Sequence, residues 1–322
     1  MESTPTVLNT RVRNSTESSR TNSYGLKTSG YVSVSVDSCE FEDYQCGIKC
    51  ENSSGFISTP TVLNTRVRNS TESSRTSTKG IEISGDIAFG IASNQFIGCD
   101  STLICRNGTN TTIQFDHNIV YETAIASGSN ALYANNVDTL IIFNNTVYNF
   151  DYGLNTVSVN YCSFYNNIFW NVSNPIQSAS STLSVSYSDI DGGYTGTGNI
   201  DSDPVFASEE NFDFSLQWNS PCIDTGTGTD DPDSTAADMG AIYYHQSGTP
   251  SQPTNIVAER NGNNLIISWD ESGNTIYYNV YSSDDPYSGW VLEEEKIRQT
   301  SWTTDFSSDK KFYRVKAING LP

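Results

Sequence analysis

The stretch STPTVLNTRVRNSTESSRT runs from Ser3 to Thr21, and the same nineteen residues run again from Ser58 to Thr76 without one substitution. The two copies are offset by 55 residues. Unrelated segments do not converge on an identical stretch of this length, so the chain contains an internal duplication. A fold that accepts 55 additional residues without disrupting its core has to be open-ended, as repeat architectures are.

A shorter pattern sets the period of the repeat. A polar residue is followed three positions later by an apolar one, at steps of 29, 26, 29, 24, 27 and 22 residues. The duplication offset is the sum of the first two steps, which is two whole turns of the pattern. We predict that the apolar residues stack in one internal column: Val12, Phe41, Val67, Phe96, Val120, Val147 and Phe169. We predict that the polar residues form a buried ladder at one corner: Asn9, Ser38, Asn64, His117, Asn144 and Asn166.

The segments between these positions alternate apolar and polar residues, as in YVSVSV and GIEIS, with Gly and Asn at the corners. Such alternation indicates strands, and no helical period stands out. Short strands in coils of 22–29 residues predict a parallel β-helix, in which each coil pairs with the next at about 4.8 Å. Inserting two whole coils keeps every inward-facing position inward. The predicted fold class is therefore all-β.

The periodicity stops at Gly198, and the segments GNIDSDPVF, FDFSLQWNSPCIDTG and ADMGA follow. They resemble the closing segment of right-handed parallel β-helix proteins that bacteria secrete, in the residues Asn199, Asp201, Asp203, Pro204, Phe206, Phe214, Leu216, Ser220, Pro221, Ile223, Asp224, Gly226, Asp238 and Gly240. The resemblance implies the pectin-lyase-like superfamily fold over residues 1–245, closed by about 198–245. It implies no single activity, because this fold serves lyases, hydrolases, adhesins and inert surface proteins.

Residues 246–253 are rich in Gly, Ser and Pro and are predicted to be a linker. Residues 254–322 then show well-separated strands and resemble a fibronectin type III module. Trp269 stands at the place of the core Trp of that family, and Tyr313-Arg-Val-Lys-Ala-Ile-Asn319 matches one of its strands. The resemblance implies a small antiparallel β-sandwich, which we expect to be incomplete at its last strand and to act as a spacer or docking module.

The charge distribution excludes some partners. The chain has 17 Lys and Arg against 37 Asp and Glu, for a net charge of −20, and no Lys or Arg occurs between Asn107 and Glu259. Such a surface is a poor match for nucleic acid, which is held by basic side chains. There is also no run of 18 apolar residues that would span a membrane. The seven cysteines leave two alternatives open, short-range disulfides or buried free thiols.

Arginines of the N-terminal coils are the first candidate site. Arg11 and Arg13, with their copies Arg66 and Arg68, flank an inward valine and are therefore expected to point outward. They could contact an anionic glycan. If the protein is a polysaccharide lyase, Arg66 and Arg68 are the candidate bases, because elimination on a uronate needs a cationic residue of this kind.

Aspartates of the closing region are the second candidate site. Hydrolysis of a glycan needs two carboxylates, and Asp189/Asp191 and Asp201/Asp203 form close pairs. The density of acidic oxygens would suit Ca²⁺, the only cofactor that we consider. The candidate ligands are Asp189, Asp191, Asp201, Asp203, Asp230, Asp231 and Asp233.

Taken together, the sequence favours a non-catalytic bacterial protein that is secreted or displayed at the cell surface and presents its β-helix to an extracellular glycan or another surface. Two alternatives stay open. One is a polysaccharide lyase or glycoside hydrolase that acts on an extracellular polysaccharide, and the other is a structural, self-assembling element.

Overall fold

The structure is a computed structural model that describes residues 2–14, 22–69, 77–246, 250–306 and 311–318. The chain forms two compact units, residues 1–202 with 239–242, and residues 203–238 with 243–322. Each unit is described by itself. Part of the predicted linker, residues 247–249, lies outside the described residues.

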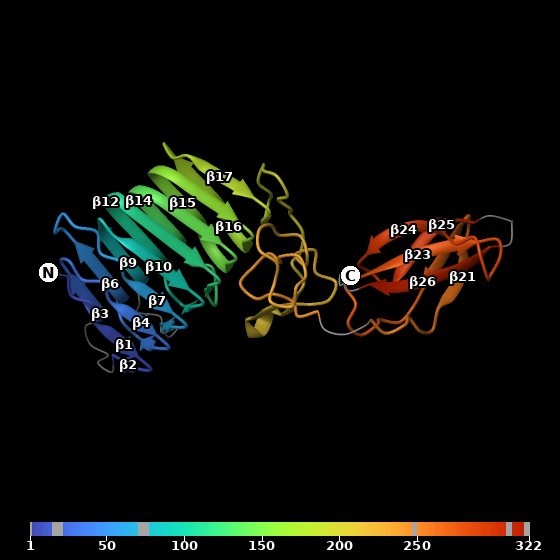
Figure 1. Cartoon of the computed structure of the whole chain (residues 1–322), viewed down its shortest axis with the longest axis horizontal. Helices are drawn as coiled ribbons and strands as arrows, with labels where there is room; N and C mark the ends of the chain where they lie inside the picture. The colour runs from blue at the N-terminus through green and yellow to red at the C-terminus, as the bar shows by residue number, and fades with distance from the viewer. Residues whose placement is uncertain (1, 15–21, 70–76, 247–249, 307–310, 319–322) are drawn as a thin grey trace. The chain divides into compact units, whose positions relative to one another are not determined.

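The first unit is a parallel β-solenoid whose coils contribute strands to three stacks (Figure 1). The first stack contains β1 (Thr6–Leu8), β4 (Ser35–Asp37), β7 (Thr61–Leu63), β10 (Ala88–Ala92) and β17 (Leu183–Ser186). The second contains β2 (Arg11–Arg13), β5 (Glu40–Glu42), β8 (Arg66–Arg68), β11 (Gln95–Ile97), β13 (Ile119–Tyr121) and β18 (Asp189–Ile190). The third begins with β3 (Tyr24–Ser29), β6 (Cys46–Asn52) and β9 (Lys79–Gly85). Four longer strands contribute to more than one stack: β12 (Ser101–Asp116), β14 (Asn130–Phe143), β15 (Thr146–Tyr165) and β16 (Ile168–Ala179).

The predicted internal column is confirmed. The register pairs each of its residues with the next, in the order Val12, Phe41, Val67, Phe96, Val120, Val147 and Phe169. Ile190 extends the column by one more coil. Every member after Val12 is at most 2% exposed, and removing a side chain of this size from water stabilises the fold by about 1.5–3 kcal/mol. The spacing of these residues in the sequence therefore reports the length of each coil.

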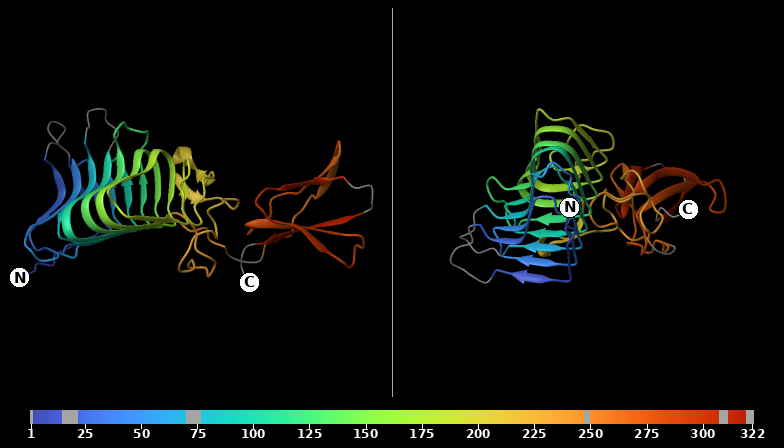
Figure 2. Two further views of the ribbon diagram at one scale, coloured as in Figure 1. Left: turned by 90° about the horizontal axis from the view of Figure 1, so that it is seen from above. Right: turned by 60° about the vertical axis from the view of Figure 1, so that its left-hand side comes forward.

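The duplicated segments lie two coils apart, as predicted. Strand β1 pairs with β4 and β4 pairs with β7, so Val7 and Val62 occupy the same position with Val36 between them. The left view of Figure 2 shows the coils following one another along the solenoid. Because each coil adds one layer, the copied residues extend the stacks without changing which side chains face inward.

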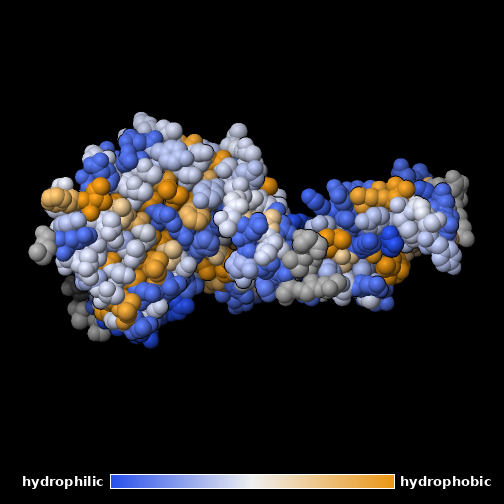
Figure 3. All heavy atoms as spheres, viewed as in Figure 1, coloured by the Kyte–Doolittle hydropathy of each residue, from blue (hydrophilic) through white to orange (hydrophobic). Residues whose placement is uncertain are grey.

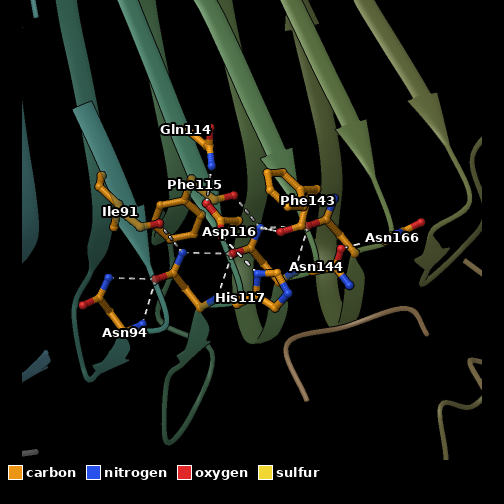
Figure 4. A network of polar contacts seen from close by, with 12 residues as sticks. Ile91, Asn94, Gln114, Phe115, Asp116, His117, Phe143, Asn144 and Asn166 are labelled. Atoms are coloured by element: carbon orange, nitrogen blue, oxygen red, sulfur yellow. Dashed lines mark hydrogen bonds and ion pairs between the residues drawn. The ribbon is translucent and has the colours of Figure 1, made fainter. Parts of the chain in front are cut away.

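The buried polar ladder lies one residue later than predicted. The backbone N and the Nδ2 of Asn94 both donate to Asn118 Oδ1 at 3.0 Å, and Asn118 Nδ2 donates to the carbonyl of Ile91 at 3.0 Å (Figure 4). The same arrangement joins Asn118 to Asn145 and Asn145 to Asn167. The four amides satisfy one another and the turn backbone inside the core.

The residues that were predicted to form the ladder instead make the corner. These residues have φ between 47° and 54°: Asn9, Ser38, Asn64, His117, Asn144 and Asn166. Ser93, which was not part of the prediction, takes the same place in its coil with φ 57°. This left-handed backbone favours Asn, which explains why Asn is frequent at these corner positions. Corner and ladder residues are adjacent and both polar, so their spacing alone could not assign the two roles.

The second unit begins with the antiparallel pair β19 (Phe206–Ser208) and β20 (Asp213–Leu216), joined by the short helix η1 (Glu209–Asn211). Two three-stranded antiparallel sheets follow, in the orders β21-β22-β25 and β24-β23-β26. Their strands are β21 (Val257–Asn261), β22 (Asn264–Ser268), β23 (Tyr277–Ser283), β24 (Val291–Ile297), β25 (Ser301–Asp305) and β26 (Phe312–Ile318). Trp269 packs in their core with Tyr278. The all-β prediction, a parallel solenoid followed by small antiparallel sheets, is confirmed.

All seven cysteines are free and buried. Of the two alternatives, the structure therefore has buried thiols. Burial raises the pKa of Cys46 and of Cys162 to about 12, which makes both thiols unreactive at neutral pH. The described part of the chain contains no helix with the length and hydropathy of a membrane span.

Candidate functional site

The arginines of the duplicated coils point outward, as expected, and the structure brings them together around acidic residues. The intervening coil places Glu40-Phe41-Glu42 between the two Arg-Val-Arg strands. Arg11 lies 3.1 Å from Glu40 and 2.9 Å from Glu42. These contacts raise the pKa of Arg11, chiefly through its hydrogen bond to Glu42.

The other arginines also have acceptors. Arg68 Nη2 lies 2.9 Å from Glu42, Arg13 Nε lies 3.4 Å from Asp43, and Arg66 Nε donates to Gln95 at 2.8 Å. An open depression of about 470 Å³ lies over this region, lined by Asn9, Thr10, Arg11, Ser38, Cys39, Glu40, Asn64 and Arg66. Arg11 and Glu40 are paired with each other and Arg66 donates to Gln95, so a ligand there would have to compete with existing contacts.

The structure does not gather the aspartates of the closing region into a metal site. Asp189, Asp201 and Asp203 each accept a bond from a nearby backbone N, those of Ser202, Gly192 and Val205 respectively. Asp233 accepts from the backbone N of Gln246 and from Thr235, and Asp231 from the backbone N of Asp238. In the part of the chain that the structure describes, no group of three or more His, Cys, Asp or Glu side chains is placed to hold a metal ion.

Two other aspartates of the closing segment, Asp224 and Asp238, take part in the hydrogen bonds of its turns. Asp238 is 1% exposed and accepts from the backbone N of Asp224 and of Tyr244. Burial raises the pKa of Asp238 to about 8 and that of Asp224 to about 6. The calcium hypothesis therefore stays a prediction, without a ligand cluster to place it.

A cleft that the sequence did not reveal lies on the outer face of the third stack. It has a volume of about 510 Å³ and is lined by Ser77, Lys79, Asp100, Ser101, Ile104, Arg106, Ala126, Ser127, Gly128 and Ser129. Strands β9 and β12 form its floor, where Lys79 lies beside Ser101 in the register. The segment that precedes β14 supplies residues 126–129.

Two cations face this cleft from neighbouring coils. Lys79 Nζ lies 2.9 Å from Glu82, and the Arg106 guanidinium lies 5.5 Å from the ring centre of Tyr133. Arg106 is exposed, and Tyr133 lies on β14 next to Ile104 in the register. A guanidinium over an aromatic face keeps its outer donors available for a ligand.

The acidic wall of the cleft is rigid. Asp100 accepts from the backbone N of Thr78 at 2.8 Å and from its hydroxyl at 3.1 Å. On the next coil, the backbone N of Gly128 donates to Asp151 at 2.7 Å, and the backbone N of Asp151 donates to Ser129 Oγ at 3.0 Å. These bonds fix the Asp100 carboxylate and the Ser129 hydroxyl at the edge of the open cleft.

The sequence held one signal for this site. Arg106 is the last basic residue before the 107–259 stretch that lacks Lys and Arg. The register was needed to place it near Lys79, because the two residues are 27 positions apart in the chain but belong to neighbouring coils.

No protein-family model matches the chain, and no curated protein matches it.

Proposed function

We propose that the solenoid is a non-catalytic glycan-binding element and that the cleft between β9, β12 and residues 126–129 is its contact site. The observation that carries the proposal is the set of groups around the cleft. Lys79 and Arg106 supply charged donors, Asp100 supplies a fixed acceptor, and Ser77, Ser101, Ser127 and Ser129 supply hydroxyl groups. A few well-placed polar groups in a concave site are what gives a small-molecule site its specificity.

The chemistry of the cleft favours a glycan that carries carboxylates. A uronate ring offers an anion to Lys79 and Arg106 and hydroxyl groups to Asp100. An arginine can bind a carboxylate through two parallel hydrogen bonds, which adds geometric selectivity. The ring of Tyr133 lies under the Arg106 guanidinium and supports it at the edge of the cleft.

The rest of the outer face suits a polymer longer than one sugar. The next residues in the Tyr133 column are Asn155 and Gln177, and the neighbouring column holds Asn130, Tyr152 and Asn174. Figure 3 shows polar side chains interspersed with apolar ones on the solenoid face turned to the viewer. Amide and phenol groups in rows offer repeated hydrogen bonds along a chain of sugars.

The lyase alternative is less well supported. Arg68 holds the buried Glu42 and Arg66 holds Gln95, so the candidate bases already serve as donors in the fold. The self-assembling alternative has no specific observation in its favour. We therefore keep both as outcomes of the test below.

The wider assignment is also a proposal. We place the solenoid in the pectin-lyase-like superfamily on its closing motif, and the sandwich with fibronectin type III modules on Trp269 and the strand Phe312–Ile318. The sandwich would act as a spacer, and the protein would work outside a bacterial cell or on its surface. Its net charge of −20 favours solubility there.

The test is a glycan array run beside a lyase assay. The array should include polygalacturonate, alginate, chondroitin and neutral polysaccharides, and the lyase assay follows the absorbance of unsaturated uronates on the three acidic polymers. We expect binding to an acidic polymer without turnover, and a loss of about tenfold or more in Arg106→Ala, since a charged hydrogen bond is worth about 1.5–3 kcal/mol.

Arg66→Ala is the matched control, because it removes an outward arginine outside the cleft. Turnover that Arg66→Ala abolishes would establish the lyase alternative instead. Neither binding nor turnover would favour the structural element. If Arg106→Ala binds the acidic polymer as the parent does, the cleft is not the binding site.

A further inference from the structure

An aromatic pair stands on the outer face of the first stack, away from the cleft residues. Phe143 at the end of β14 and Tyr165 at the end of β15 occupy the same position on adjacent coils. Their rings lie parallel, 5.1 Å apart between centres with an interplanar angle of 3°. Both side chains are partly exposed. Parallel rings on an outer strand end are not needed to fill the core.

The pair is held rigid from one side. His117 packs edge-on against Phe143, with ring centres 5.8 Å apart (Figure 4). Asp116 Oδ2 lies 3.0 Å from His117 Nδ1, and Asp116 Oδ1 accepts a hydrogen bond from Gln114 Nε2 at 2.9 Å. Gln114, Asp116 and His117 thus brace Phe143, and Phe143 braces Tyr165. A ring that is fixed before a ligand arrives loses little entropy on binding.

On the side of Tyr165 that faces away from Phe143, the next coil presents small residues. The next position in the same column is Ser186, and the outward residue two places before it is the exposed Ser184. The coil beyond contributes Thr197, whose carbonyl accepts from the backbone N of Tyr187. A serine side chain is too small to cover the face of a tyrosine ring, and Tyr165 is partly exposed, so part of this face can meet a flat ligand with hydroxyl groups around it.

We infer that Tyr165 is a stacking site for a neutral sugar ring, separate from the cleft. The C–H groups on one face of a pyranose carry partial positive charge and pack against the negative face of an aromatic ring. In β-1,4-linked glucose or xylose every ring substituent is equatorial, so the faces present only C–H groups. The ligand class is therefore a neutral β-1,4-linked glucan or xylan. The inference rests on the proposed glycan-binding function only for this choice of ligand class.

The experiment is calorimetric titration of the full chain with cellohexaose and with xylohexaose. We expect binding of at least one of them. Tyr165→Ala should weaken it about tenfold, whereas Tyr165→Phe, which keeps the ring, should stay within about threefold of the parent. Ser186→Leu should also weaken binding about tenfold, because the larger side chain covers the ring face without changing Tyr165. Circular dichroism of each variant checks that it is folded.

Arg106→Ala separates the two sites. It should not change the affinity for the neutral hexaoses, and Tyr165→Ala should not change the affinity for an acidic polymer. If the protein binds a neutral hexaose but no acidic polymer, the Tyr165 site is supported and the proposed function of the cleft is contradicted. Absence of binding to both hexaoses, or a Tyr165→Ala variant that binds them like the parent, would overturn the inference.

Discussion

Arg68 Nη2 lies 2.9 Å from Glu42 Oε1, and the side chain of Glu42 is only 1% exposed. Arg11, on the coil before Glu42, lies 2.9 Å from the other carboxylate oxygen. The two arginines are in duplicated segments, and Glu42 belongs to the coil between them. The duplication therefore surrounded a buried carboxylate with a cation on each side.

Replacing Arg68 by Met should destabilise the solenoid. The substitution keeps much of the aliphatic packing and removes one of the two arginines that donate to Glu42 Oε1, so that Arg11 alone of this pair still donates to the buried carboxylate. We expect a loss of about 1–2 kcal/mol, toward the low end for a charged hydrogen bond because Arg68 is half-exposed. Urea unfolding followed by circular dichroism measures it. Arg106→Met, which removes an arginine that does not contact Glu42, is the control and should change stability by less than about 0.5 kcal/mol. Equal effects of the two variants would contradict the role given to Arg68.

The asparagine ladder makes a second prediction. Asn118→Asp keeps the shape of the side chain but removes both Nδ2 bonds, to the carbonyl of Ile91 and to Asn145 Oδ1. It also places a carboxylate against another acceptor in a site with no solvent access. We expect a loss of about 2–4 kcal/mol at neutral pH. Asn155→Asp, on the outer face of β15, is the matched control and should cost less than about 1 kcal/mol. If both variants unfold at the same urea concentration, the ladder does not stabilise the core.

The column and the ladder show what the sequence could and could not predict. Val12 and Val67 were placed correctly, because a buried apolar position must recur once per coil and its spacing is visible in the sequence. Asn118 was missed in favour of His117, because a left-handed corner and the buried position after it both select polar residues. The difference between them is the direction of the side chain, which the spacing does not encode.

The cleft was missed for a different reason. Lys79, Asp100 and Arg106 have no motif spacing, and only the register of β9 against β12 makes them neighbours. Arg11 and Arg66 are conspicuous in the sequence because they are repeated. Dividing the 55-residue offset into two coils also places Glu40 and Glu42 between them, so these acids are predictable as partners of the arginines. A candidate site on a solenoid has to be judged across coils as well as along the chain.

Glu122 predicts a pH dependence of stability. It is 8% exposed, and its Oε1 has no hydrogen-bond partner among the described residues. Burial, with a smaller contribution from Asp100, raises its pKa from 4.5 to about 8. A carboxyl whose pKa is raised on folding stabilises the fold when protonated. That contribution is complete below pH 4.5 and is lost as the pH rises to about 8.

Glu122→Gln should remove the part of the pH dependence that Glu122 causes, because the amide stays neutral at every pH, whereas Asp224 and Asp238 still contribute theirs. We expect the variant to match the parent near pH 4.5 and to exceed its stability at pH 8.5, with urea midpoints measured across that range. The variant curve should be flatter between these limits. A parent and a variant whose midpoints fall in parallel as the pH rises would show that Glu122 is not the source of the dependence.

The last prediction concerns the duplication itself. Inserting a further copy of residues 10–64 after Asn64 adds 55 residues, and both new junctions repeat sequence contexts that the chain already has. Every inward position stays inward, so the solenoid should lengthen by about 10 Å and keep a cooperative unfolding transition, with a midpoint at or above that of the parent. The control inserts residues 11–64 and so omits Thr10. Arg11 then takes the place of Thr10, whose copy Thr65 is buried, and Val12 turns outward, which should lower the midpoint and broaden the transition. Thermal unfolding followed by far-ultraviolet circular dichroism compares the two chains. If both insertions are tolerated equally, register across the coils does not control the stability of this fold.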